Sequence, residues 1–193
     1  ACCDTTISIT WGGAPGSDTI RVVVTSGLCP NDTASLPIVL GGTFTSAATG
    51  FWDVGGTWVG GSAPGNGDSV IIVASHIVTV RTATDSCSSV SLNTAALSDA
   101  MIVVNTASAL SVANDIELNG SGNGRAQITV NGTGVLSVAG NIDMNDVVTN
   151  FAAAIFMNDG GASTLNLGGN MVLNTLGRYE SGAGNTLNLN GTG

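Results

Sequence analysis

The second half of the sequence repeats. Between Met101 and Gly193, short apolar-x-apolar triplets recur three to a line, and the lines end on Gly, Asn, Ser or Asp. Leu110 and Leu136 hold equivalent places 26 residues apart, and Leu165 follows after 29 more. Repeats of this length are typical of solenoids, in which each repeat forms one turn and stacks on its neighbour. The sequence therefore predicts an all-β chain containing a right-handed parallel β-helix.

Alternation within each triplet predicts which side chains face the interior. Successive side chains of a strand point to opposite faces, so the outer two residues of a triplet share one face. Stacked coils bury that face and align like positions in columns. The predicted inward columns are Leu110/Leu136/Leu165, Val112/Val138/Leu167, Ile116/Ile142/Met171 and Leu118/Met144/Leu173.

Asparagines fall at the expected corners of each coil. The two sets are Asn119/Asn145/Asn174 and Asn105/Asn131/Asn158/Asn190. Stacked amides hydrogen-bond one another along the axis of such a fold, and Asn is also a common turn former, so both interpretations stay open. A fourth line is predicted to open with Leu187–Asn190, because LNLNGTG resembles the ITVNGTG that begins at Ile128. We expect this mid-coil end to be covered by further polypeptide or by another chain.

Composition limits the partners of the chain. Its net charge is −9, with four basic residues that are all Arg, so an acidic surface without a basic stripe argues against nucleic acid. No apolar run approaches the length that spans a bilayer, and no signal peptide is visible. Charged residues make up only 9% of the chain, which together with abundant Gly favours strands and tight turns over helices.

The cysteines favour an oxidising compartment. They are Cys2, Cys3, Cys29 and Cys87; no Cys-x-x-Cys pair occurs, and His76 is the only histidine. Disulfides therefore fit better than a metal site, and they imply an extracellular setting. Cys29 is expected to pair with Cys2 or Cys3, while Cys87 pairs with the remaining cysteine or stays a buried thiol. Four cysteines allow three connectivities, which the sequence does not distinguish.

Residues 1–40 read as a separate β unit. Predicted strands at 6–11, 19–25 and 35–40 are too few for a closed sandwich. Trp11-Gly12, the Ile20–Val24 strand and the lone Cys29 before a last strand resemble the C-terminal half of an Ig-like or PKD-like sandwich of secreted bacterial surface proteins. The resemblance implies part of an Ig-like unit at 1–40, followed by a connector at 41–60.

The stretch after residue 57 carries a more specific pattern. Trp58, Pro64, Gly67-Asp68, Val70–Ile72 and Val78–Val80 resemble the opening motif of G8-like β-helix modules in secreted Bacteroidota proteins. The resemblance implies a β-helix over 61–193, with an irregular first coil at 61–100 and regular coils at 101–193. Trp52 and Trp58 are large enough to cap its open end, or to form a sugar-binding platform. Asp68 is expected to bind free backbone amides and start a strand.

Carboxylates are the candidate chemical groups. Glu117 and Asp143 hold equivalent outward positions in successive coils, with Asp115 and Asp146 nearby. Two carboxylates about 5 Å apart could share a Ca²⁺ ion or serve a glycosidase or lyase, and the alternative is an exposed, solvated acidic face. His76 has no companion motif for nucleophilic catalysis, and no catalytic residue is predicted. Thr19, Thr33 and Ser69 follow Asp in short motifs that resemble Bacteroidota O-glycosylation sites.

Together these features predict a structural or adhesive segment of a secreted cell-surface protein or extracellular filament. Its expected partners are other copies, neighbouring segments of a longer polypeptide, or glycans. The alternative is a polysaccharide-active or carbohydrate-binding β-helix module.

Overall fold

The computed structural model describes residues 16–26, 29–146, 153–158, 161–174 and 176–190, and within them the chain is built almost wholly of strands. All strands but the first two belong to three parallel sheets. Sheet 1 contains, in pairing order, β19 (Thr186–Leu189), β16 (Thr164–Leu167), β13 (Val135–Val138), β10 (Ala109–Val112) and β7 (Asp85–Cys87). Sheet 2 contains β17 (Met171–Leu173), β14 (Ile142–Asp146), β11 (Ile116–Gly120), β8 (Ser89–Asn93), β5 (Ser69–Val73) and β3 (Thr43–Thr45). Sheet 3 contains β18 (Arg178–Ser181), β15 (Ala153–Met157), β12 (Ala126–Val130), β9 (Ala100–Val104), β6 (Ile77–Val80) and β4 (Gly50–Phe51).

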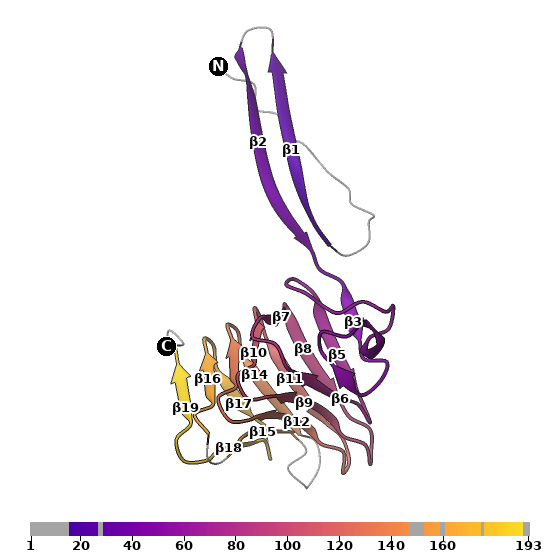
Figure 1. Ribbon diagram of the computed structural model, residues 1–193, viewed down its shortest axis with the longest axis vertical. Helices are drawn as coiled ribbons and strands as arrows, with labels where there is room; N and C mark the ends of the chain where they lie inside the picture. The colour runs from indigo at the N-terminus through magenta and orange to yellow at the C-terminus, as the bar shows by residue number, and fades with distance from the viewer. Residues whose placement is uncertain (1–15, 27–28, 147–152, 159–160, 175, 191–193) are drawn as a thin grey trace.

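The chain visits the three sheets in rotation and so winds into a β-solenoid of about five turns (Figure 1). Each turn adds one strand to each sheet, and every inner strand pairs in parallel with the strands of the turns before and after it. The backbone amides and carbonyls are therefore satisfied between turns. The predicted all-β solenoid is confirmed.

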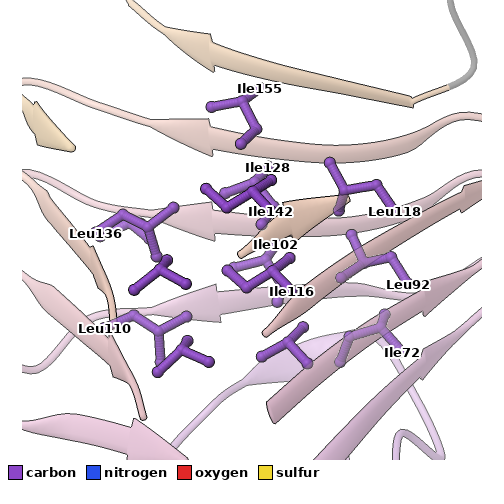
Figure 2. Packing of buried hydrophobic residues seen from close by; sticks show 14 of the residues in the cluster. Ile72, Leu92, Ile102, Leu110, Ile116, Leu118, Ile128, Leu136, Ile142 and Ile155 are labelled. Atoms are coloured by element: carbon purple, nitrogen blue, oxygen red, sulfur yellow. The ribbon is translucent and has the colours of Figure 1, made fainter. Parts of the chain in front are cut away.

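The interior is made of apolar columns that run along the axis. Leu110 lies opposite Leu136, and Leu136 opposite Leu165. Ile102, Ile128 and Ile155 form a second column, contributed by sheet 3. All of these side chains are fully buried. Figure 2 shows Leu110 and Leu136 stacked in one column and Ile102, Ile128 and Ile155 in the other. Burying one Leu or Ile side chain stabilises the fold by roughly 1.5–3 kcal/mol, so the columns carry most of its stability.

Asparagine amides form a ladder at one corner, as one of the two interpretations predicts. Asn145 donates from Nδ2 to Oδ1 of Asn119 at 3.1 Å, and Asn174 donates to Oδ1 of Asn145 at 2.7 Å. The ladder continues to Asn93, whose Oδ1 accepts from Asn119 at 3.0 Å. These hydrogen bonds link four successive turns and hold the corner in register.

The solenoid begins earlier than the predicted boundary at residue 61. β3 pairs with β5 and β4 pairs with β6, so residues 41–60 supply two strands of a partial first turn in addition to the helix η1 (Gly55–Thr57). Phe44 of β3 lies opposite Val70 and packs against the core. The stretch predicted as a connector is thus part of the stacked structure.

The last turn has a different register from the predicted one. β19 pairs with β16, which places Leu187 opposite Leu165, and β18 places Tyr179 opposite Ile155. The prediction that Asn190 joins the column of Asn131 and Asn158 is therefore wrong, because Asn190 follows the sheet 1 strand. The cause is a shorter turn, since equivalent residues Asn166 and Asn188 are only 22 positions apart.

Upstream of the solenoid, β1 (Gly16–Ser26) and β2 (Cys29–Leu40) form a two-stranded antiparallel sheet. These strands contain the predicted strands at 19–25 and 35–40, and Thr19 lies opposite Pro37. The predicted strand at 6–11 lies outside the described residues. An Ig-like arrangement of this region stays a prediction.

Candidate functional site

Glu117 and Asp143 lie where the repeat places them. They are direct partners on β11 and β14 of sheet 2, on the outer face, one strand spacing of about 4.8 Å apart. The same outward column continues with Ser91 on β8 and Val172 on β17. The acidic part of the column is therefore a single pair of carboxylates, and its neighbours on either side are uncharged.

A groove of about 310 Å³ adjoins this pair on the outer face of sheet 2. Its polar lining includes Ser69, Ser89, Ser91, Asn114, Asp115 and Glu117. Asp115 has a structural role, because its Oδ1 accepts a hydrogen bond of 2.6 Å from the backbone amide of Asn141 in the next turn. Asp146 ends β14 opposite Gly120, and its side chain lies outside the described part.

Among the described residues, few polar groups surround the acidic pair. Within the described ranges, neither Glu117 nor Asp143 has a hydrogen-bond partner that would fix its orientation. Nor does any group of three His, Cys, Asp or Glu residues come together in that part of the chain. Calcium takes six to eight oxygen ligands, so two carboxylates on an open face provide at most a loose site.

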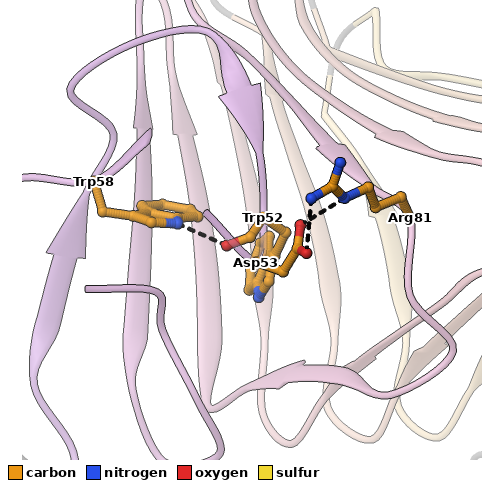
Figure 3. A network of polar contacts seen from close by, with 4 residues as sticks. All are labelled: Trp52, Asp53, Trp58 and Arg81. Atoms are coloured by element: carbon orange, nitrogen blue, oxygen red, sulfur yellow. Dashed lines mark hydrogen bonds and ion pairs between the residues drawn. The ribbon is translucent and has the colours of Figure 1, made fainter. Parts of the chain in front are cut away.

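Trp52 and Trp58 form the N-terminal cap of the solenoid. Their rings meet edge to face, with centroids 5.3 Å apart, and they are 1% and 2% exposed. The indole Nε1 of Trp58 donates to the Trp52 carbonyl at 2.8 Å, as Figure 3 shows. Such burial leaves no ring face for a sugar to stack on, which favours the cap over the platform.

An ion pair lies on the outside of this cap. Nε and Nη2 of Arg81 donate to the two carboxylate oxygens of Asp53 at 2.9 and 3.0 Å (Figure 3). The hydrogen bonds from Arg81 hold the pKa of Asp53 below its usual range. The Arg81 guanidinium also lies 4.0 Å from the ring centre of Phe51, so one side chain ties β4 to β6. These contacts are exposed, so their contribution to stability is small.

Ser46 and His76 form a pair that sequence reasoning missed. Ser46 Oγ lies 2.9 Å from His76 Nδ1 and accepts the backbone amide of Val73 at 3.0 Å. Ser46 is 2% exposed, so its hydroxyl is inaccessible to a substrate and the pair joins two turns of the solenoid. The only signal in the sequence is their separation of 30 residues, which is close to one repeat.

Cys87 is a free thiol, buried in the core. Burial raises the pKa of this thiol to about 12. It therefore has little thiolate character and is chemically inert, in agreement with the buried-thiol alternative. Cys2 and Cys3 lie outside the described residues, as does the side chain of Cys29, so their pairing stays a prediction.

A second groove, of about 370 Å³, runs along the solenoid where sheet 1 turns toward sheet 2. Ala113, Ala139 and Gly168 line the corner, and Ser86, Ser111, Ser137 and Asn166 line its side on sheet 1. None of its lining residues is charged. The sequence contains a signal for this corner, since Ala113, Ala139 and Gly168 follow equivalent strands.

Comparisons with protein-family models, curated proteins and solved structures found no match to this chain. Within the described ranges, no helix has the length and apolar character needed to cross a membrane.

The candidate glycosylation residues have different surroundings. Thr19 and Thr33 lie on β1 and β2, where only the backbone is described. Ser69 on β5 accepts a hydrogen bond of 3.0 Å from the hydroxyl of Ser89. Asp68 binds backbone amides as predicted, since its two oxygens accept from Gly42 and Gly65, each at 2.8 Å. The Asp in that motif is thus explained by the start of β5.

Proposed function

We propose that the chain is a structural and adhesive segment of a secreted cell-surface protein or extracellular filament, in which a stiff solenoid presents its outer side chains. The observation that carries the proposal is continuous stacking: three parallel sheets share one apolar core, and corner amides add hydrogen bonds between the turns. Such a structure resists local opening because each inner turn is held on both sides.

The finer parts of the proposal rest on the sequence. A right-handed winding is proposed because parallel β-crossover connections are almost always right-handed. The G8-like opening motif and the Ig-like pattern of residues 1–40 support a bacterial surface protein of the Bacteroidota type. The cysteine content supports an extracellular location. Surface labelling of intact source cells by an antibody against the solenoid tests that location, and signal only after lysis would contradict it.

Association with a neighbouring segment or chain is part of the proposal. The turn formed by β17–β19 exposes apolar side chains in columns that are buried elsewhere, with Leu173 48% and Leu189 64% exposed. The outer edges of its strands have no partner among the described residues. Both features support a covering partner at this end. Light scattering across a concentration series measures whether the 193-residue chain alone associates.

The second candidate function is a polysaccharide-active enzyme, favoured by the direct pairing of Glu117 with Asp143. Carboxylates about 5 Å apart have the spacing found in retaining glycosidases. The chain and its Glu117→Gln and Asp143→Asn variants are incubated with neutral and acidic polysaccharides, and new reducing ends and unsaturated products are measured. We expect no turnover above the buffer level from any of them. Turnover by the parent chain that either substitution abolishes would overturn the structural assignment.

Limited proteolysis provides the positive test. We expect the solenoid to survive a protease concentration that digests a Leu136→Ala variant, because cleavage of a folded repeat array follows its opening. Equal digestion of the two chains would contradict the rigid-rod mechanism.

A further inference from the structure

The groove between sheets 1 and 2 has hydrogen-bonding groups that the fold does not use. Among the described residues, the hydroxyls of Ser86 and Ser111 have no hydrogen-bond partner, and neither does the side-chain amide of Asn66. Ser137 Oγ accepts from Asn166 Nδ2 at 3.0 Å, which leaves its own proton available. The three serines follow one another from turn to turn, about 4.8 Å apart along the axis.

The charge of the chain restricts what can lie there. The groove has no charged lining residue, whereas the chain as a whole carries a net charge of −9. Asp115 and Glu117 lie on the neighbouring sheet and line the other groove. An anionic polymer would be repelled, and a cationic one would be drawn to the acidic face instead. An uncharged ligand is the one that this groove favours.

The size of the face decides between a second protein and a polymer chain. Sheet 1 has five strands, and β10 and β13 have four residues each. At about 4.8 Å between strands and 3.3 Å per residue, its outer face covers roughly 300 Å². A stable protein interface buries about 800 Å² on each partner. The face is too small for that, yet long enough for several units of an extended chain.

The direction of the groove excludes a peptide strand. The groove crosses the strands, and the backbone groups of β10, β13 and β16 already pair on both sides within sheet 1. A ligand therefore meets side-chain hydroxyls and amides, which both donate and accept hydrogen bonds, beside apolar surface from Val112, Val138 and the small corner residues. Sugar hydroxyls have the same dual capacity, and an extended glycan repeats at a spacing close to that of the turns.

We propose that this axial groove binds an extended, uncharged polysaccharide, with about one sugar per turn. The inference rests on the adhesive function proposed above and names its face and ligand class. Asn66 precedes the first strand of sheet 1 and Asn190 follows the last, and both line the groove, so the polysaccharide would span the turns from β7 to β19. Without an aromatic platform, each sugar is held weakly and affinity grows with the number of turns engaged.

The test is retention of the 193-residue chain by insoluble cellulose, chitin and β-1,3-glucan, with polygalacturonate in an affinity gel as the acidic counterpart. We expect retention by at least one neutral polysaccharide and none by polygalacturonate. Replacing Ser86, Ser111 and Ser137 together by Val should weaken retention about tenfold or more, since several hydrogen bonds are lost. Val is a strong strand former, and circular dichroism verifies the fold.

The matched control replaces Ser89 and Ser91 by Val on the outer face of sheet 2. These serines line the acidic groove, and retention should stay within about twofold of the parent because the axial groove is untouched. Should the triple variant not fold, Asn66→Ala on the exposed loop is the second probe, again with weaker retention expected. The inference would be overturned if no neutral polysaccharide retained the chain, or if only polygalacturonate did. It would also be overturned if the axial-groove variant and the sheet 2 control lost retention equally. A chain that resists protease but binds no neutral glycan overturns this inference alone and leaves the structural role standing.

Discussion

Replacing Leu136 by Ala tests the stacked core at its centre. Leu136 is fully buried, with Leu110 on one side of it and Leu165 on the other. The change removes three carbon atoms, worth about 2.4 kcal/mol at ~0.8 kcal/mol for each buried group. Neighbours held in two sheets cannot collapse into the space, so a cavity penalty adds to this. We expect the free energy of unfolding to fall by roughly 3–5 kcal/mol.

Leu187 is the matched control, because it occupies the same column on β19. Its side chain is 39% exposed, so removing the same three carbon atoms loses only about 1.5 kcal/mol of hydrophobic burial, and no closed cavity forms. Leu187→Ala should therefore cost about 1.5 kcal/mol or less. The difference between the two variants measures the value of having a turn on both sides.

Urea unfolding followed by far-ultraviolet circular dichroism measures both variants. The midpoint should fall with little change in slope for Leu136→Ala, because the same surface is exposed on unfolding. Equal losses for the two leucines, or a loss below about 1 kcal/mol at Leu136, would refute the columnar core.

Three further predictions concern single groups. Trp58→Phe should lower the free energy of unfolding in urea by about 1–3 kcal/mol, because it leaves the buried Trp52 carbonyl without its hydrogen-bond donor. Trp52→Phe should lower it clearly less, because the Trp52 Nε1 has no partner among the described residues. The reverse order would contradict the cap geometry. Asn145→Ala breaks two ladder hydrogen bonds and should cost about 1–2 kcal/mol by the same measurement, whereas a change under about 0.5 kcal/mol would show that the amides act only as turn formers. Burial raises the pKa of the Asp85 carboxyl above its ordinary value of 3.8. The folded chain therefore holds the carboxyl proton more tightly than the unfolded chain, and the stability that this group contributes is lost as pH rises through the raised pKa. Asp85→Asn should therefore raise the urea midpoint at pH 7 and leave it nearly unchanged at pH 3; a gain that is equal at both pH values would count against the burial effect.

The columns of the regular coils could be predicted because the same period-two alternation returns in each line. Leu110, Leu136 and Leu165 each begin an apolar-x-apolar triplet, and any shift by one residue would turn them toward water. The Glu117–Asp143 pair followed from the same register. The first partial turn gave no such signal, because β3 is Thr43-Phe44-Thr45 and offers only one apolar side chain.

The axial groove could not be found from chemical motifs, because it exists where side chains are small. Ala113 and Ala139 add only methyl groups to its lining, and at Gly168 a Cβ atom would lie 2.5 Å from the carbonyl oxygen of Ala139, so the close approach of the turns requires Gly there. A sequence shows directly which groups are present, but the space that absent atoms leave depends on how turns stack. The hydroxyls of Ser86 and Ser111 gain their relation to one another only through the pairing of β7 with β10.

The error in the last turn shows which part of a repeat defines its register. The NGTG at 190–193 matches the NGTG at 131–134, whereas the strand before it, TLNL at 186–189, is identical to TLNL at 164–167. Strands must pair residue by residue with the turn below, while corners can shorten or lengthen without disturbing that pairing. Equivalent residues are accordingly 26, 29 and 22 positions apart in successive turns, and the strands stay in register throughout. Aligning such repeats on their strands and letting the corners vary would also have assigned β18, whose single inward aromatic residue, Tyr179, continues the Ile155 column.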